Sequence, residues 1–130
     1  MQLPYDFIHS TRQLMGDALY ATLEAGLNAN PLVSIRINPF KLKTGTFDVH
    51  GAESPVPWCP NGFYLAERPN FTFDPMLHQG LSYVQEAASM FIDYVVRNVV
   101  QQPARMLDLC AAPGGKSTCA YSALPAGSVL

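Results

Sequence analysis

Residues 106–118 read Met-Leu-Asp-Leu-Cys-Ala-Ala-Pro-Gly-Gly-Lys-Ser-Thr, and this stretch decides the fold class. An apolar run reaches Asp108, small residues around Pro113 form a tight turn, and helix-forming residues follow. A strand, a glycine-rich turn and a helix in this order predict the start of a doubly wound α/β sheet. At such a turn, a ligand can lie against the bare backbone N–H groups of a helix N-terminus.

Two phosphate-binding patterns fit the glycine turn poorly. A P-loop requires G-x-x-x-x-G-K-[ST], and residues 115–117 supply only the end of it. Cys110 occupies the first glycine position, and Pro113 has no N–H to donate to a phosphate. A dinucleotide fingerprint would lack two of its three glycines. An NTPase therefore remains a minor alternative.

The third pattern is the S-adenosylmethionine loop of Rossmann-type methyltransferases. It needs an acid at the strand end and then small residues at every second position, where the cofactor lies over the backbone. Asp108, Cys110, Ala112 and Gly114 have this spacing. Asp108 is placed to meet the amino group of the cofactor, and Lys116 its carboxylate. Gly114→Val is expected to abolish cofactor binding by filling the space that the ligand needs.

The two halves of the chain have different patterns. In the first half, residues 10–13 fit a capping box, and helical periodicity continues to about Asn28. Residues 32–37 alternate like a strand, and residues 41–70 are rich in turns, with a short strand near Phe63. These features predict a small α/β N-terminal domain over residues 1–72.

The second half, residues 73–130, predicts the first part of a Rossmann-type sheet. Residues 82–85 fit another capping box, which predicts a helix that residues 101–103 end, with Asp93 and Arg97 paired on its outer face. We expect a strand, a helix and the opening of a second strand over residues 105–109, 115–123 and 127–130.

Here the sequence resembles a known family. Residues 107–118 closely resemble the cofactor loop of the Sun/Fmu family of RNA cytosine-C5 methyltransferases, which reads D-x-C-A-A-P-G-G-K-[ST]. Residues 34–39, SIRINP, are similar to the family's S-[IV]-R-[VI]-N-[PT] strand. Residues 80–89, GLSYVQEAAS, resemble its G-x-x-[YF]-x-Q-[DE]-x-[SA]-S segment. The similarity covers most of residues 32–120.

The resemblance implies an S-adenosylmethionine-dependent methyltransferase acting on ribosomal or transfer RNA. The cofactor-binding residues that it implies are Asp108, Cys110, Ala111, Ala112, Pro113, Gly114, Gly115 and Lys116. The two catalytic cysteines of the family lie in Pro-Cys and Thr-Cys motifs of later strands, so we expect them beyond Leu130. The 130-residue chain alone is therefore expected to be inactive. The alternative is a fragment that binds RNA or cofactor without catalysis.

Composition sets further limits. The net charge of −2 is not the basic footprint of a dedicated nucleic-acid binder, although Arg36, Lys41 and Lys43 are candidates for RNA phosphate contacts or for a solvated loop. Aromatic residues at positions 58–73 are candidates for base stacking or for a small loop core. Three cysteines without a CxxC pair predict no disulfide framework and no metal site. We expect a cytoplasmic protein without a signal peptide or membrane span.

Overall fold

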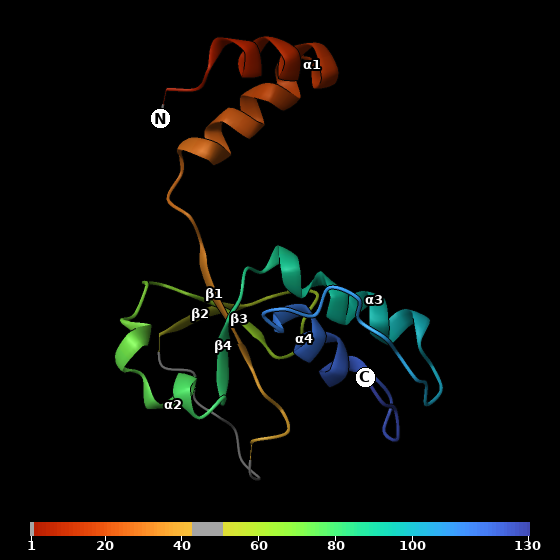
Figure 1. Cartoon of the computed structure of the whole chain (residues 1–130). Helices are drawn as coiled ribbons and strands as arrows, with labels where there is room; N and C mark the ends of the chain where they lie inside the picture. Colours follow the sequence, from red (N-terminus) through yellow and green to blue (C-terminus); the bar gives the residue numbers. More distant parts are fainter. Residues whose placement is uncertain (1, 43–50) are drawn as a thin grey trace. The chain divides into compact units, whose positions relative to one another are not determined.

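The chain divides into two units, Met1–Pro31 and Leu32–Leu130. The computed structural model describes residues 2–42 and 51–130 (Figure 1). No helix in these two ranges is long and apolar enough to cross a membrane. The predicted boundary after residue 72 does not coincide with the division between the units, and as a boundary between functional domains it stays a prediction.

The second unit is built on four short antiparallel strands in the order β2-β3-β1-β4. β1 (Val33–Ile37) lies between β3 (Gly62–Leu65) and β4 (Ser82–Val84), and β2 (Ala52–Pro55) pairs with β3 at the edge. The strands expected at residues 32–37 and near Phe63 are confirmed as β1 and β3. β2 was not predicted, since its exposed sequence AESP has no apolar alternation.

β1 is buried on both faces of the sheet. Ile35 and Ile37 pack with Leu65 in one apolar cluster, whereas Ser34 and Arg36 are buried on the opposite face. Such burial of polar side chains is tolerated only when each one finds hydrogen-bond partners. The side chains of β1 therefore carry the contacts that join the sheet to the rest of the unit.

The first unit contains α1 (Tyr5–Asn28). The helices of the second unit lie outside its sheet: they are the short η1 (Phe71–Phe73) and α2 (Pro75–His78), η2 (Ala88–Met90), α3 (Phe91–Val99) and α4 (Gly115–Ala123). α3 and α4 lie side by side on one flank of the sheet, and α2 lies on the other (Figure 1). α4 has the bounds that the sequence predicted.

The predicted start of the first helix is wrong. α1 begins at Tyr5, after Pro4, so Ser10 lies inside the helix rather than at its cap. A proline before the first turn serves as a start because the N–H that it lacks would be unpaired there. The helix is also interrupted at Gly16, where φ is 78° and ψ is 164°. The predicted end near Asn28 is confirmed.

The second predicted capping box is also wrong. Residues 82–84 form β4 instead of a helix start, with Ile35 opposite Val84 and Ile37 opposite Ser82. The free edge of β1 offers a ladder of backbone hydrogen bonds, and this tertiary pairing overrides the local capping pattern. The α-helix begins only at Phe91, after a 3-10 turn.

The segment after α3 takes part in a parallel pairing. Arg105 forms an isolated parallel bridge with Val129, and Met106 N donates to Val129 O at 2.8 Å. The expected order of strand, glycine turn, helix and parallel strand is thus present. The two expected strands, however, pair only through this one bridge between Arg105 and Val129. Leu107 and Leu109 are 82% and 86% exposed because no other described segment covers them.

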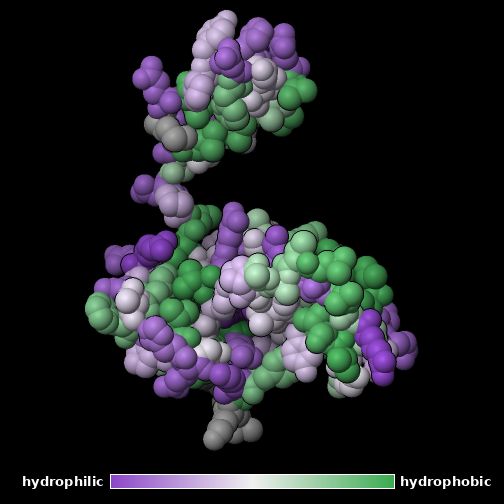
Figure 2. Space-filling model, in the orientation of Figure 1, coloured by the Kyte–Doolittle hydropathy of each residue, from purple (hydrophilic) through white to green (hydrophobic). Residues whose placement is uncertain are grey.

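The core between the helices differs from the prediction at one residue. Val96 packs against Ala120 and Ala123 where α3 meets α4. Asp93 is fully buried rather than on the outer face, although its predicted ion pair with Arg97 is present. The opposite face of α3 exposes apolar side chains, and Figure 2 shows apolar surface there.

We predict that Gly62→Ala destabilises the unit by about 1–3 kcal/mol through overpacking. A Cβ at Gly62 would lie 2.7 Å from Met90 Sδ and 3.0 Å from Val56 Cβ. The urea midpoint measures the loss. Gly26→Ala is the matched control, because nothing lies within 4 Å of its Cβ position, and it should leave stability unchanged or higher. Equal midpoints for the two variants would contradict the packing described for β3.

Candidate functional site

The glycine turn leads directly into α4. Gly114 precedes the helix with φ 104° and ψ 0°, a left-handed conformation that disfavours any side chain. Its carbonyl accepts hydrogen bonds from Thr118 N at 2.9 Å and from Thr118 Oγ1 at 2.8 Å. No side chain caps the N-terminus of α4. The first N–H groups of the helix are therefore left for a ligand or for water.

The structure adds a second reason for a glycine at position 114. A Cβ at this position would meet only Ala111 O, at 3.9 Å, so space is available. The positive φ is a separate backbone constraint, and the expectation that Gly114→Val would fill the space of the cofactor stays a prediction. Gly115 is the crowded position, because a Cβ there would lie 3.0 Å from Cε1 of Tyr83.

Asp108 accepts hydrogen bonds from two residues that follow it in the glycine turn and in α4. Its Oδ2 accepts from Ser117 Oγ at 2.6 Å, and its Oδ1 accepts from Cys110 N at 2.9 Å. These hydrogen bonds, with a smaller effect from the charge of Lys116, hold the pKa of Asp108 below its ordinary value. Asp108 lies beside a separate cavity, and its contact with a cofactor stays a prediction.

The remaining predicted cofactor residues surround one cavity of about 300 Å³. Residues 110–116 form one wall, and residues 83–86 with Ser89 form the other. The structure thus joins the glycine turn to the segment that follows β4. Tyr83, Val84, Glu86 and Ser89 were not predicted as site residues from their chemistry, and only the similarity of residues 80–89 to a family segment indicated them.

Arg36 joins the sheet to the glycine turn. It is 4% exposed, and its Nε donates to Gln85 Oε1 at 2.9 Å. Its Nη2 donates to Thr118 Oγ1 at 2.6 Å and approaches Gly115 O at 3.5 Å. Gln85 Nε2 also donates to Gly115 O, at 3.2 Å. The start of α4 is therefore held by one side chain from β1 and by one that directly follows β4.

The candidate RNA contacts have different environments. Arg36 lies inside the unit, so it is not on the surface where a phosphate contact was expected. Lys41 is exposed, and its amine donates to Gln79 O. Lys43 lies outside the described residues. Among the aromatic residues, Trp58, Phe63, Tyr64 and Phe71 pack against core clusters, whereas Phe73 is 80% exposed.

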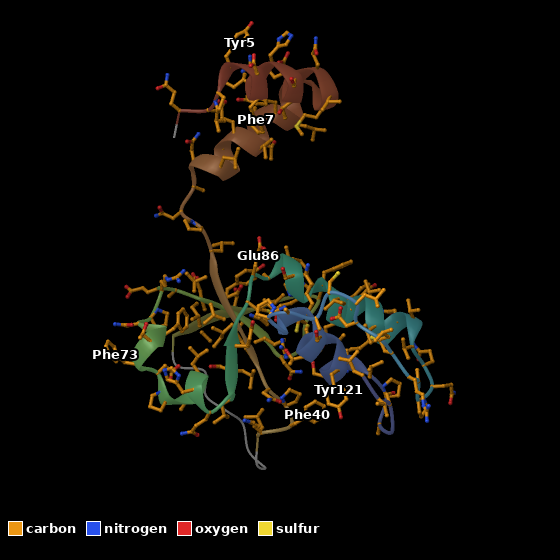
Figure 3. The ribbon with its side chains drawn as sticks, viewed as in Figure 1. Tyr5, Phe7, Phe40, Phe73, Glu86 and Tyr121 are labelled. Atoms are coloured by element: carbon orange, nitrogen blue, oxygen red, sulfur yellow. The ribbon has the colours of Figure 1, made fainter. Side chains whose placement is uncertain are left out.

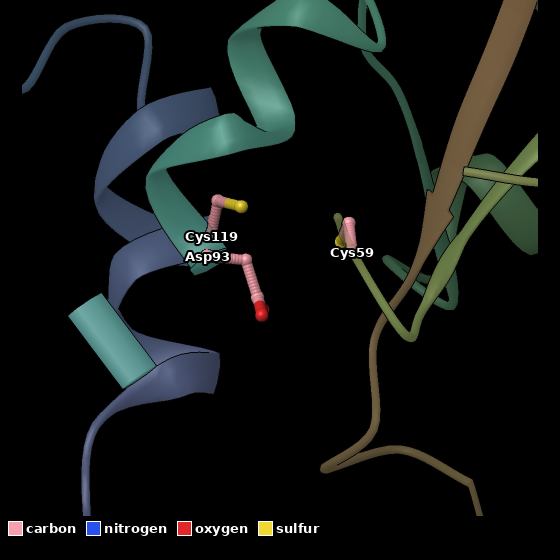
Figure 4. Close-up of side chains that lie close together, drawn as sticks. All are labelled: Cys59, Asp93 and Cys119. Carbon is pink, nitrogen blue, oxygen red and sulfur yellow. The ribbon is translucent and has the colours of Figure 1, made fainter. Parts of the chain in front are cut away.

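A buried cluster that the sequence did not predict lies near the site (Figure 4). The Sγ atoms of Cys59 and Cys119 and a carboxylate oxygen of Asp93 lie within 4.8 Å of one another, and all three residues are fully buried. A hydrogen bond from Cys119 lowers the pKa of Cys59, while the pKa of Cys119 is raised. Both carboxylate oxygens of Asp93 accept from Arg97, which raises the pKa of Arg97.

This cluster is better described as a hydrogen-bonded part of the core than as a metal centre. It offers three ligand atoms, whereas a structural zinc site uses four. The described residues contain no larger group of this kind. Thr118 and Cys119 form a Thr-Cys pair like that of the family's catalytic motif. The Cys119 thiol is nevertheless a poor nucleophile, because it is buried and its pKa is raised.

We predict that Arg36→Lys lowers the free energy of unfolding by about 3 kcal/mol, because one ammonium cannot replace the forked contacts of the guanidinium and leaves buried acceptors unpaired. Urea unfolding measures the change. Arg105→Lys, at an exposed position, is the control and should shift stability by less than about 0.5 kcal/mol. A similarly small shift in Arg36→Lys would mean that the network does not hold the turn.

We predict that Ser117→Ala raises the pKa of Asp108 toward its ordinary value, because the largest stabiliser of the carboxylate is removed. A lowered pKa in the folded state means that this stabilisation is present at neutral pH and is lost as the pH falls through the folded-state pKa. Carboxylate NMR titration of Asp108 measures the shift. Ser122→Ala is the control, since Ser122 donates to Cys119 O and not to Asp108. An unchanged titration in Ser117→Ala would refute the assignment.

Comparison with known proteins places these features in a family. Residues 3–87 match the family described as the N-terminal domain of 16S rRNA methyltransferase RsmF. Ribosomal RNA small subunit methyltransferase F of Pectobacterium atrosepticum is 34% identical over 126 residues, which cover 89% of this chain and 26% of that protein. The chain thus spans about a quarter of the length of this relative.

Two solved structures agree in fold. The crystal structure of PH0851 has a TM-score of 0.70 and 25% identity, covering 93% of this chain and 28% of that chain. A methyltransferase homolog from Pyrococcus horikoshii has a TM-score of 0.65 and 28% identity, covering 87% of this chain and 38% of that chain. The predicted resemblance and fold class are confirmed. The chain belongs to the RsmF N-terminal domain family of ribosomal RNA methyltransferases.

Proposed function

We propose that this chain is the N-terminal part of an S-adenosylmethionine-dependent methyltransferase that modifies C5 of a cytosine in ribosomal RNA. The observation that carries the proposal is the cavity where residues 83–86 meet residues 110–116, at a helix start without a side-chain cap. Family membership supports the proposal, as does the name of the Pectobacterium relative.

The lining of the cavity fits S-adenosylmethionine better than a nucleotide phosphate. Small residues from Cys110 to Gly115 expose backbone on which the ribose and the methionine chain of the cofactor can lie without a phosphate. Pro113 interrupts the row of N–H groups that a triphosphate would need. Glu86 and Lys116 lie on opposite walls, and their charges complement the amino and carboxylate groups of the cofactor.

When bound, the cofactor supplies an activated methyl group on a sulfonium. The described residues of this chain contribute binding and orientation: α4 presents its N-terminus, Asp108 keeps the turn closed, and Arg36 fixes the turn against the sheet. Cys59 and Cys119 are buried, and Cys110 lies within the turn, so none of these thiols is placed as the cytosine nucleophile. We propose that the nucleophile belongs to the Pro-Cys and Thr-Cys motifs that the family resemblance implies beyond Leu130.

The same proposal assigns a role to each of the two predicted domains. Residues 1–72 contact RNA and residues 73–130 begin the catalytic domain, in a cytoplasmic protein. A cofactor- or RNA-binding fragment without catalysis is the second candidate. It is distinguished by whether the protein encoded by the whole gene transfers a methyl group to 16S rRNA from S-adenosylmethionine.

We predict that the protein encoded by the whole gene binds S-adenosylmethionine in calorimetry and that Gly114→Ala weakens this binding by about tenfold, because the strain of a left-handed alanine favours a rearranged turn that must be restored when the cofactor binds. Gly127→Ala is a matched control, because Gly127 also has a positive φ of 87° but does not line the cavity. It should lose stability without losing cofactor affinity. Binding of ATP with Mg²⁺ in place of S-adenosylmethionine would overturn the proposal in favour of an NTPase.

A further inference from the structure

A second cavity, of about 530 Å³, lies next to the proposed cofactor cavity. Tyr83 lines both cavities, so the two share a wall. The lining combines aromatic and cationic side chains with hydroxyl groups: Arg36, Phe40, Lys41, Tyr83, Thr118 and Tyr121. None of the aromatic side chains in this cavity was among the candidates for base stacking in the sequence.

An exposed aromatic pair forms one side of this cavity. The centroids of the Phe40 and Tyr121 rings lie 5.2 Å apart at an interplanar angle of 42°, although the two residues are 81 positions apart in the sequence. Phe40 is 65% exposed and Tyr121 is 44% exposed, so neither ring is needed to fill the core. Figure 3 shows the pair together, away from Phe73.

The turn after β1 holds Phe40 in this position. Asn38 Oδ1 accepts from Phe40 N at 3.1 Å, and Asn38 Nδ2 donates to Gly80 O at 3.1 Å. Lys41 N donates to Asn38 O, which closes the turn. The aromatic platform is therefore ordered before any ligand arrives, which lowers the entropy cost of binding.

The charge of the cavity has one sign. Arg36 and Lys41 line it, and no Asp or Glu is among the described lining residues. Nε and Nη2 of Arg36 donate to Gln85 and to the first turn of α4, and the guanidinium keeps its positive charge at the wall of the cavity. Within the described part of the chain, the exposed amine of Lys41 donates only to Gln79 O, and an ammonium has three N–H donors. Lys41 can therefore also bind an anion.

We propose that this second cavity binds an unpaired nucleotide of the RNA substrate. The base stacks on the Phe40–Tyr121 pair, and the phosphate meets Lys41. Aromatic faces combined with cations and without carboxylates favour single-stranded nucleic acid. The inference rests on the proposed function, because it takes RNA as the substrate, and the shared wall at Tyr83 would bring this nucleotide close to the cofactor.

The first test compares RNA affinities by fluorescence anisotropy. The protein encoded by the whole gene is titrated with a short fluorescein-labelled single-stranded RNA and with the same sequence as a duplex. Phe40→Ala and Tyr121→Ala should each weaken single-strand binding by about 5- to 100-fold. Tyr121→Trp should preserve binding, since it keeps a stacking face. Tyr94→Ala is the matched control at another exposed ring, which lines neither cavity, and it should have no effect.

The second test concerns the phosphate. Lys41→Gln should reduce the slope of log affinity against log salt by about 0.7, the value of one phosphate contact on a single strand. Arg105→Gln is the control at an exposed cation outside the cavity, and it should leave the slope unchanged.

The outcomes separate this inference from the proposed function. Unchanged single-strand affinity in both alanine variants, or equal affinity for the duplex, overturns the inference. Both results leave the proposed function standing if the parent protein still binds S-adenosylmethionine and methylates RNA. Failure of the parent to bind S-adenosylmethionine overturns the proposed function instead. The affinity of Phe40→Ala for S-adenosylmethionine should equal that of the parent, because Phe40 does not line the cofactor cavity.

Discussion

The buried guanidinium of Arg36 is the constraint on which the rest of the second unit depends. A charge that is 4% exposed must be hydrogen-bonded, because burial without partners costs several kcal/mol. Its acceptors come from Gln85 after β4 and from the first turn of α4. The antiparallel sheet and the glycine turn therefore form one body through contacts between residues that are 49 and 82 positions apart in the sequence.

Elements with strong local signals were predicted from the sequence. α4 follows from the glycine turn and from helix-forming residues, and β1 follows from its alternation of apolar residues. β4 was missed because Ser82 and Gln85 match a capping box, and a local pattern does not reveal that β1 has a free edge nearby. The burial of Asp93 was missed for a related reason: its pairing with Arg97 also fits an exposed helix face, and only the packing of α4 against α3 excludes water.

The site was predicted in part for the same physical reason. The turn at residues 110–116 is contiguous, so its spacing of small residues is visible in the sequence. The opposite wall, with Tyr83 and Glu86, comes together only through the pairing of β4 with β1. The sequence shows that position 36 is an arginine, but it does not show whether the side chain faces a phosphate at the surface or a glutamine in the core.

The position of Tyr83 connects the two proposed ligands. Its ring lies against Gly115, where any side chain would displace it, and the guanidinium of Arg36 lies 6.0 Å from its centroid. One face of this wall therefore borders the glycine turn, and the other borders the cavity with Phe40 and Tyr121. A ligand that moves Tyr83 on one side must change the shape of the cavity on the other. Since the coupling free energy between two binding sites is reciprocal, the factor by which the cofactor changes the affinity for the nucleotide equals the factor by which the nucleotide changes the affinity for the cofactor.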